Sequence, residues 1–164
     1  MSSPASPSPS VGRLARGCLA ALLGAAAAAA LGIGAAAPAS AVPQELVFIE
    51  HAASDATTDT GAKGDSAGDI LTFANEVFDA QDATRVGNDQ GMCVRTVAGS
   101  AWECFWTLTL AAGQITVQGP FYDSGDSVLA ITGGTGAYAN AQGDMLLSAV
   151  GTDGSKYRFT YRLL

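Results

Sequence analysis

The stretch VLAITGGTGAYANAQGDM, from Val128 to Met145, decides between two folds for this chain. Its glycines suggest a phosphate-binding loop, but such a loop needs a lysine after the glycines and a helix whose N-terminus faces the anion. Here Gly136 is followed by Ala137 and Tyr138, and no lysine or arginine occurs before Lys156. No helix-length apolar periodicity follows, so the dinucleotide-binding pattern fails as well. We therefore interpret the stretch as a tight connection between two β-strands, in which glycines adopt positive φ.

Alternation of apolar and polar residues, the pattern of half-buried strands, runs through the rest of the chain. Eight segments show it, separated by turn-rich connections: residues 44–51, 69–78, 90–97, 101–110, 113–119, 127–132, 143–150 and 157–164. We expect an all-β fold in which these eight strands form an antiparallel β-barrel, because pairing of the first strand with the last removes both sheet edges. An open sandwich is the alternative architecture. A barrel of eight strands is wide enough to hold one small ligand.

The first 41 residues have the features of a secretory signal peptide. Arg13 and Arg16 precede an apolar run over residues 18–37, and residues 39–41 form a small-residue cleavage site. An uncleaved membrane anchor is the alternative, since about 20 apolar residues can span a bilayer. Cleavage would release residues 42–164 as one secreted domain of ordinary size.

The chain is acidic, with a formal net charge of −7. Removal of the leader would take away two of the eight basic residues and none of the 15 acidic ones. Such a surface repels phosphate backbones and is not attracted to anionic lipids. We therefore expect no nucleic acid and, after cleavage, no membrane among the partners.

Cys93 and Cys104 are the two cysteines that follow the leader, an even number in an exported protein. They bracket VRTVAGSAWE, which is typical of two strands that meet at a turn. With a four-residue loop at residues 97–100, the two cysteines lie opposite each other in a non-hydrogen-bonded pair, where side chains are closest. We expect one disulfide; two free buried thiols are the alternative.

Two polar residues are candidates for chemistry because the rest of their strand face is apolar. Glu50 shares a face with Leu46 and Phe48, and a carboxyl among apolar groups has a raised pKa that suits an acid or a base. Asn75 shares a face with Phe73, and an amide facing an apolar lumen needs a partner such as ordered water, Glu50 or a ligand. A strand-end glutamate near water and a purely structural asparagine are the alternatives.

Metal and nucleophile chemistry have little support in the sequence. His51 is the only histidine, so it cannot form a multi-histidine metal site, and we expect an ordinary exposed strand residue there. The polar segment 52–68 is expected to be a mobile loop, and its aspartates do not match the spacing of a calcium loop. We expect neither a bound metal nor a Ser–His–Asp triad.

Several separated motifs resemble the allene oxide cyclase barrel, which is related to plant dirigent proteins. They are QELVFIE (44–50), GDILTFANEVFD (68–79), RVGNDQGMCVRT (85–96), ITVQGP (115–120) and SVLAITGGTGAYANAQGDM (127–145). The resemblance covers nearly all of residues 44–164 and implies an eight-stranded barrel with an apolar lumen, usually trimeric, that needs no cofactor. Plant allene oxide cyclases close an unsaturated fatty-acid epoxide into a cyclopentenone, and dirigent proteins steer the coupling of phenoxy radicals.

The family's lumenal glutamate falls on Glu50, its water-binding asparagine on Asn75 and its lumenal cysteine on Cys93. The asparagine two places after the glutamate is Ala52 here, and the tyrosine after QGP is Phe121, which has no hydroxyl. A site that must hold one water for an epoxide oxygen has thereby lost two polar groups. We therefore do not carry the cyclase reaction over to this chain.

The expected function is that of a secreted, cofactor-free barrel that binds and orients a small apolar or aromatic molecule by pre-organisation. Its role would be dirigent-like stereocontrol or an activity of the cyclase or isomerase type. Glu50 and Asn75 are the catalytic candidates, and Phe73, Trp106 and Phe121 are the candidate ligand-binding residues of the lumen wall. The alternatives are a non-catalytic carrier and a structural protein with a filled barrel. A homotrimer is expected from the resemblance alone.

Overall fold

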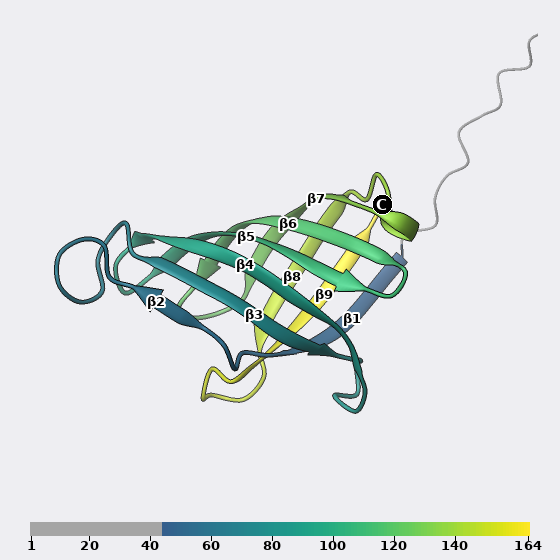
Figure 1. The fold of residues 1–164 in the computed structure, drawn as a ribbon, viewed down its shortest axis with the longest axis horizontal. Helices are drawn as coiled ribbons and strands as arrows, with labels where there is room; N and C mark the ends of the chain where they lie inside the picture. The colour runs from purple at the N-terminus through teal and green to yellow at the C-terminus, as the bar shows by residue number, and fades with distance from the viewer. Residues whose placement is uncertain (1–43) are drawn as a thin grey trace, which may run out of the picture. The chain divides into compact units, whose positions relative to one another are not determined.

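The computed structural model describes residues 44–164, so the expected signal peptide at residues 1–41 lies outside the described residues. Nine strands and one short 3₁₀-helix make up the described chain (Figure 1). In chain order they are β1 (Gln44–His51), β2 (Ala56–Thr58), β3 (Ile70–Phe78), β4 (Arg85–Val97), β5 (Ala101–Leu110), β6 (Gly113–Tyr122), β7 (Ser127–Gly134), η1 (Gly136–Tyr138), β8 (Gly143–Ala149) and β9 (Lys156–Leu163). Over this part of the chain, no helix is long and apolar enough to cross a membrane.

All strands except β2 close into a barrel of eight antiparallel strands. The order around the barrel is β1, β9, β8, β7, β6, β5, β4 and β3, after which β3 returns to β1. β1 pairs with β9 over its whole length, as expected for the first and last strands. The seam between β1 and β3 is short and involves only Ile49, Glu50 and His51 of β1. The closed barrel confirms the expected fold and excludes the open sandwich.

β2 is a strand that the sequence does not predict. Because β3 extends past the end of β1, its first residues have no partner in the barrel on that side. β2 pairs with them, from Ala56 opposite Thr72 to Thr58 opposite Ile70. The polar segment between β1 and β3 therefore continues the sheet before it becomes a loop.

The barrel is solidly packed towards one end. Figure 1 places η1 and the C-terminus at one end of the barrel and the loop between β2 and β3 at the other. The packed part is close to η1, since Ile115 pairs with Gly134, the last residue of β7. Inward-facing side chains without any exposed surface fill it: Val77, Leu108, Ile115, Val117, Leu129, Met145 and Tyr161. Each such apolar side chain contributes about 1.5–3 kcal/mol through burial, and the pocket described below lies towards the other end of the lumen.

The glycine-rich connection is a structural bend, as the sequence predicts. It forms the end of β7, the helix η1 and the start of β8. Gly136 has φ of +61°, and a Cβ there would collide with the carbonyl oxygen of Ala112 in the turn between β5 and β6. Glycine therefore allows the connection to pass directly over that turn.

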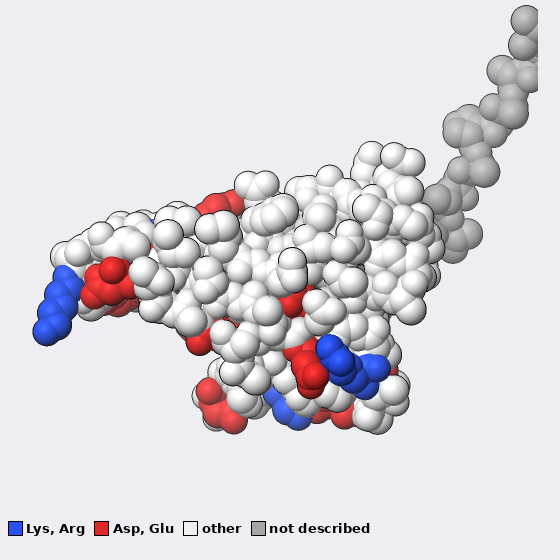
Figure 2. Space-filling model, viewed as in Figure 1, with Lys and Arg blue, Asp and Glu red and all other residues white. Residues whose placement is uncertain are grey.

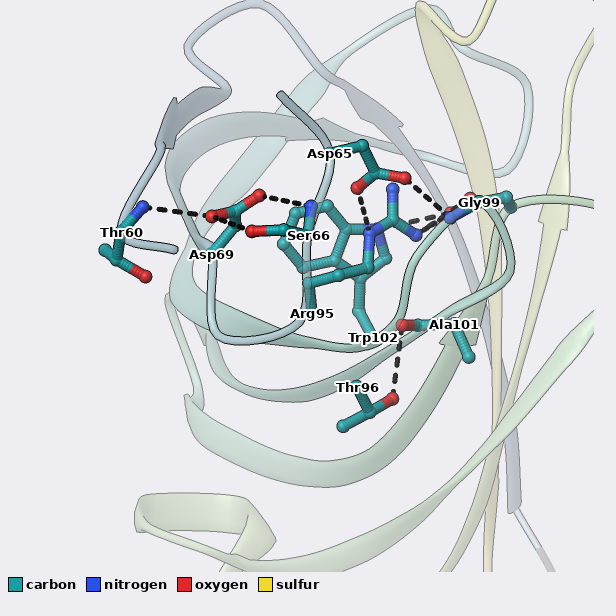
Figure 3. Close-up of polar contacts among 10 residues, drawn as sticks. Thr60, Asp65, Ser66, Asp69, Arg95, Thr96, Gly99, Ala101 and Trp102 are labelled. Atoms are coloured by element: carbon teal, nitrogen blue, oxygen red, sulfur yellow. Dashed lines mark hydrogen bonds and ion pairs between the residues drawn. The ribbon is translucent and has the colours of Figure 1, made fainter. Parts of the chain in front are cut away.

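A buried arginine joins segment 59–69, the loop between β2 and β3, to the barrel (Figure 3). Arg95 donates from Nε to Asp65 at 2.7 Å and from Nη1 to both carboxylate oxygens of Asp123 at 2.7 and 2.8 Å. Its guanidinium carbon lies 4.0 Å from the centre of the Trp102 ring. The indole of Trp102 also donates to Asp123. We call these four residues the Arg95 cluster.

Asp69, the last residue of the same segment, bonds other residues within it. Its carboxylate accepts hydrogen bonds from the backbone N–H groups of Thr60 at 2.9 Å and Ser66 at 2.8 Å (Figure 3). These bonds lower the pKa of Asp69 below its ordinary value. Of the aspartates that make the segment polar, Asp65 attaches it to the barrel, through Arg95 and the backbone N–H of Gly99, while Asp69 closes the segment on itself.

Candidate functional site

A pocket opens at the end of the barrel opposite η1, beside the residues that follow β1. It encloses about 380 Å³ that protein atoms do not occupy, the mouth open to solvent included. Much of its wall is aromatic and is formed by Phe73, Trp106, Phe121, Tyr157 and Phe159. Only a small part of this volume is wide enough between the side chains to hold a water molecule. A ligand of aromatic size therefore requires some of these side chains to move.

The aromatic wall residues pack against one another mainly edge to face. Phe73 contacts Trp106 with ring centroids 6.0 Å apart, and Phe121 contacts Tyr157 at 5.8 Å. Such arrangements place the positive edge of one ring against the negative face of the next. Phe73, Trp106 and Phe121, the three residues expected to line the lumen, all lie in this wall, on β3, β5 and β6.

Glu50, the last residue but one of β1, is part of the pocket wall. Only 5% of the residue is exposed. Asn75 donates from Nδ2 to Oε1 of Glu50 at 2.8 Å. Burial raises the pKa of Glu50 to about 7, although the hydrogen bond from Asn75 opposes this shift. The carboxyl therefore changes charge near neutral pH, which is the range in which a general acid or base is most effective.

Asn75 connects Glu50 to the residues that follow β1. Its Nδ2 also donates to Asp55 at 2.8 Å, and its Oδ1 accepts from both the backbone N–H and the hydroxyl of Ser54, at 3.0 and 2.9 Å. All four hydrogen-bonding positions of the amide are thus occupied. Of the partners expected for this residue, the structure shows Glu50. The arrangement also brings Asp55 into the pocket wall.

A second buried carboxyl lies next to Glu50 and was missed by sequence reasoning. Asp89 of β4 is directly opposite Asn75 of β3 and has no exposed surface. Burial raises its pKa to about 9, and the charge of Glu50 adds to this shift. The expected strand began one residue after Asp89, whereas β4 begins at Arg85. If the expected strand had been extended towards Arg85, the two-residue alternation would have placed Asp89 on the same inward face of the strand as Cys93. This alternation was the signal in the sequence that could have found Asp89.

Cys93 and Cys104 form the expected disulfide, which lines one side of the pocket. They are directly opposite each other on β4 and β5, with Cα atoms 4.0 Å apart. The register is the expected one, but the loop is one residue shorter because the ladder is irregular between Arg95 and Val97. With both sulfurs bonded, neither is a nucleophile.

His51 does not take part in the pocket. Its Nε2 lies 2.6 Å from Oδ1 of Asp82, and its ring stacks on Phe78 with centroids 4.1 Å apart. It is half-buried, so the expectation of an exposed residue is wrong: these two contacts cover the ring. Within residues 44–164, no cluster of histidine, cysteine or acidic side chains is suited to a metal ion.

Residues 64–68 read GDSAG, which has the letters of a nucleophile elbow. They lie in the loop before β3, not between a strand and a helix, and the hydroxyl of Ser66 contacts Asp69. The histidine bonded to Asp82 belongs to a different part of the barrel. No Ser–His–Asp triad is therefore assembled in the described part of the chain.

The molecule is thus an eight-stranded antiparallel barrel with a pocket at one end of its lumen. It belongs to the allene oxide cyclase family, whose sequence profile, described as "Allene oxide cyclase", matches residues 46–162. Among solved structures it is similar to a pyocyanin demethylase, with 28% identity and a TM-score of 0.64. That match covers 75% of this chain and 100% of the other.

Two further solved structures share the fold. A pterocarpan synthase dirigent protein is 16% identical with a TM-score of 0.61, over 75% of this chain and 94% of the other. The Diels–Alderase AbmU from Streptomyces koyangensis is 17% identical with a TM-score of 0.61, over 74% of this chain and 63% of the other. At these identities the likeness concerns the barrel and not its chemistry.

Proposed function

We propose that the barrel binds a small apolar or aromatic molecule in its pocket and promotes a cofactor-free conversion of the cyclase or isomerase type, or a dirigent-like orientation. The observation that carries this proposal is the carboxyl of Glu50, which is almost fully buried in a wall of aromatic side chains. A carboxyl with a pKa of about 7 exchanges a proton readily at neutral pH. The similar structures named as a demethylase, a synthase and a Diels–Alderase support a small-molecule ligand.

The proposed mechanism is pre-organisation combined with acid–base assistance. The aromatic wall would select one conformer of the ligand, which lowers the entropic cost of reaching the reactive geometry. Glu50 would accept or return one proton at the reacting end of the ligand, and Asn75 would keep the carboxyl in place. A carrier is the second candidate, because its pocket would look the same. Since little of the pocket volume admits even a water molecule, a filled barrel that binds nothing is the third candidate.

The experiment compares Glu50→Gln with Glu45→Gln. Glu45 lies on the same strand but is exposed, so it is a matched control. Native mass spectrometry of protein from its own secretions would first identify the bound molecule. For a catalyst, Glu50→Gln should keep the affinity for that molecule and lose about 10²–10⁴ in rate, while Glu45→Gln changes neither. A wild-type protein that binds the molecule and never converts it would identify a carrier.

We further propose that the chain is exported and loses residues 1–41. A disulfide is consistent with an oxidising compartment outside the cytosol. The test is the N-terminal sequence of the secreted protein, which should begin at Val42. A product that stays in the membrane with its leader attached would contradict this proposal.

A homotrimer is proposed from the resemblance to the family. Exposed apolar side chains on the outer barrel face support it: Met92, Val94, Phe105 and Val128 are each between 40% and 52% exposed. Met92 and Phe105 are direct neighbours on β4 and β5. Figure 2 shows a strand surface that is largely uncharged in the centre of the view, with charged side chains gathered near the margins. Native mass spectrometry should report three chains, and a single chain at micromolar concentration would contradict the proposal.

A further inference from the structure

Asp89 and Glu50 bring two buried carboxyl groups together in the interior of the barrel, because Asp89 lies directly opposite Asn75 in the sheet and the side chain of Asn75 is bonded to Glu50; each carboxyl also shifts the pKa of the other. The two oxygens of Asp89 have no side-chain hydrogen-bond donor among the described residues, and the donor close to them is the backbone N–H of Asn75, which lies opposite Asp89 in the sheet and lowers its pKa against the larger effect of burial. Two carboxylates offer each other only lone pairs, so their contact becomes a hydrogen bond only when one of them carries a proton. A fully buried carboxylate with no side-chain donor and no cation beside it is strongly unfavourable. The pair must therefore keep one proton over a wide pH range.

The surroundings determine which residue keeps that proton. Glu50 lines the pocket and has Asn75 as a hydrogen-bond donor, and both features favour its charged form. Asp89 lies outside the pocket wall and pairs across the sheet with Leu108, a residue with no exposed surface. The charge therefore belongs on Glu50 and the proton on Asp89.

We propose that Asp89 is a positioning residue for Glu50: it holds a proton, donates it in a hydrogen bond to the Glu50 carboxylate, and so orients that carboxylate towards the ligand. With Asn75 and Asp89 both donating to it, Glu50 directs its remaining acceptor capacity into the pocket. Its partner on the ligand is then a proton donor. This use of the pair rests on the proposed function, but the pair itself is a property of the ligand-free protein.

The other titratable groups around the pair fit this assignment. They are Asp55 from the segment after β1, His51 from β1, and Tyr157 and Tyr161 from β9. Asp55 raises the pKa of both carboxyls by repulsion, and burial together with nearby carboxylates raises the pKa of both tyrosines, which stay neutral. His51 lowers the pKa of Glu50, but it is the smallest of the contributions and its ring is bonded to Asp82. No lysine or arginine contributes to the environment of either carboxyl.

The test is a titration of the side-chain carboxyl carbons by ¹³C NMR in ligand-free protein. In the wild type, two carboxyls should titrate above the ordinary range, one near 7 and one near 9, with pKa values that depend on each other. Glu50→Gln assigns the signals, and Asp126→Asn, at an exposed position, is the control that should change neither. Fewer than two raised titrations in the wild type would overturn the proposal without any variant.

Asp89→Asn separates the proposal from simple charge repulsion. An asparagine amide donates a hydrogen bond as the protonated aspartate does, so the upper titration should disappear while the pKa of Glu50 stays within about half a unit. Asp89→Leu has no donor, and there the pKa of Glu50 should rise. A fall of the Glu50 pKa towards its ordinary range in Asp89→Asn would show that Asp89 is charged, and would refute the assignment. These titrations need no ligand, so they are independent of the outcome for the proposed function.

Discussion

Replacing Arg95 by methionine tests how strongly the Arg95 cluster holds segment 59–69, the loop between β2 and β3. The Arg95 side chain is only 9% exposed, whereas its partners Asp65 and Asp123 are 43% and 30% exposed. Methionine keeps an unbranched apolar side chain against Trp102 but removes the charge and every donor. The variant therefore isolates the polar contribution of the Arg95 cluster.

The expected loss follows from the burial of these groups. Removing one member of a buried ion pair costs about 3–5 kcal/mol because the partner charge is left buried and unpaired. Here water can reach both aspartates, so the lower end of the range applies, and we expect a loss of about 3 kcal/mol in the free energy of unfolding. The pair of Arg162 with Asp144 is the matched control, since both side chains are nearly half exposed. Arg162→Met should lose at most about 1 kcal/mol.

Two assays check this prediction. Urea unfolding measures both losses under the same conditions, and the slope with denaturant shows whether the folded states are equally compact. Limited trypsin digestion reports on the loop itself, because Lys63 is an exposed cleavage site within it. Cleavage after Lys63 should be faster in Arg95→Met and unchanged in Arg162→Met. Equal losses in the two variants, or unchanged cleavage in Arg95→Met, would refute the reasoning.

Two further predictions concern stability. Replacing Cys93 and Cys104 together by alanine should lower the free energy of unfolding by about 3 kcal/mol, because the bond closes a loop with a sequence separation of 11; a loss below about 1 kcal/mol in urea unfolding would contradict this. The second is a pH dependence: folding raises the pKa of Glu50 from 4.5 to about 7. Its protonated form thus contributes stability below about pH 4.5 that is lost as the pH rises through 7, on the order of 3 kcal/mol. Glu50→Gln should lack this contribution, so wild type and variant compared at about pH 5 and 9 should diverge, and parallel curves would count against it.

Particular residues show which features of the structure could be predicted from the sequence. The alternation around Cys93 and Cys104 was enough to predict their register and their bond, because the two strands are joined by a short loop and turn geometry determines which residues face each other. The same alternation predicted an inward Glu50 and an inward Asn75. It could not reveal that Asp55 reaches the pocket, since segment 52–68 has no period and its path depends on Asn75 from another strand.

For Asp89, local alternation gives the direction of the side chain but not its partner. Its own strand indicates only that it points inward, and an inward aspartate in isolation is an unexplained buried charge. Its meaning comes from Glu50, which lies on a strand that β4 does not touch and is brought near by the seam between β1 and β3. A seam of three residue pairs at the closure of the barrel is a long-range feature, and no local pattern in the chain encodes it.

The sequence by itself determined the class of fold, the eight strands of the barrel, the disulfide and the side of each of these strands that faces the lumen, because all of these depend on a two-residue period and on short turns. The tertiary structure alone decided which inward groups meet: the closure of the barrel sets the stagger between distant strands, and this stagger places Glu50, Asn75 and Asp89 together. Contacts between residues far apart in the chain are decided by packing the whole barrel at once, and the chemistry of the pocket depends on those contacts.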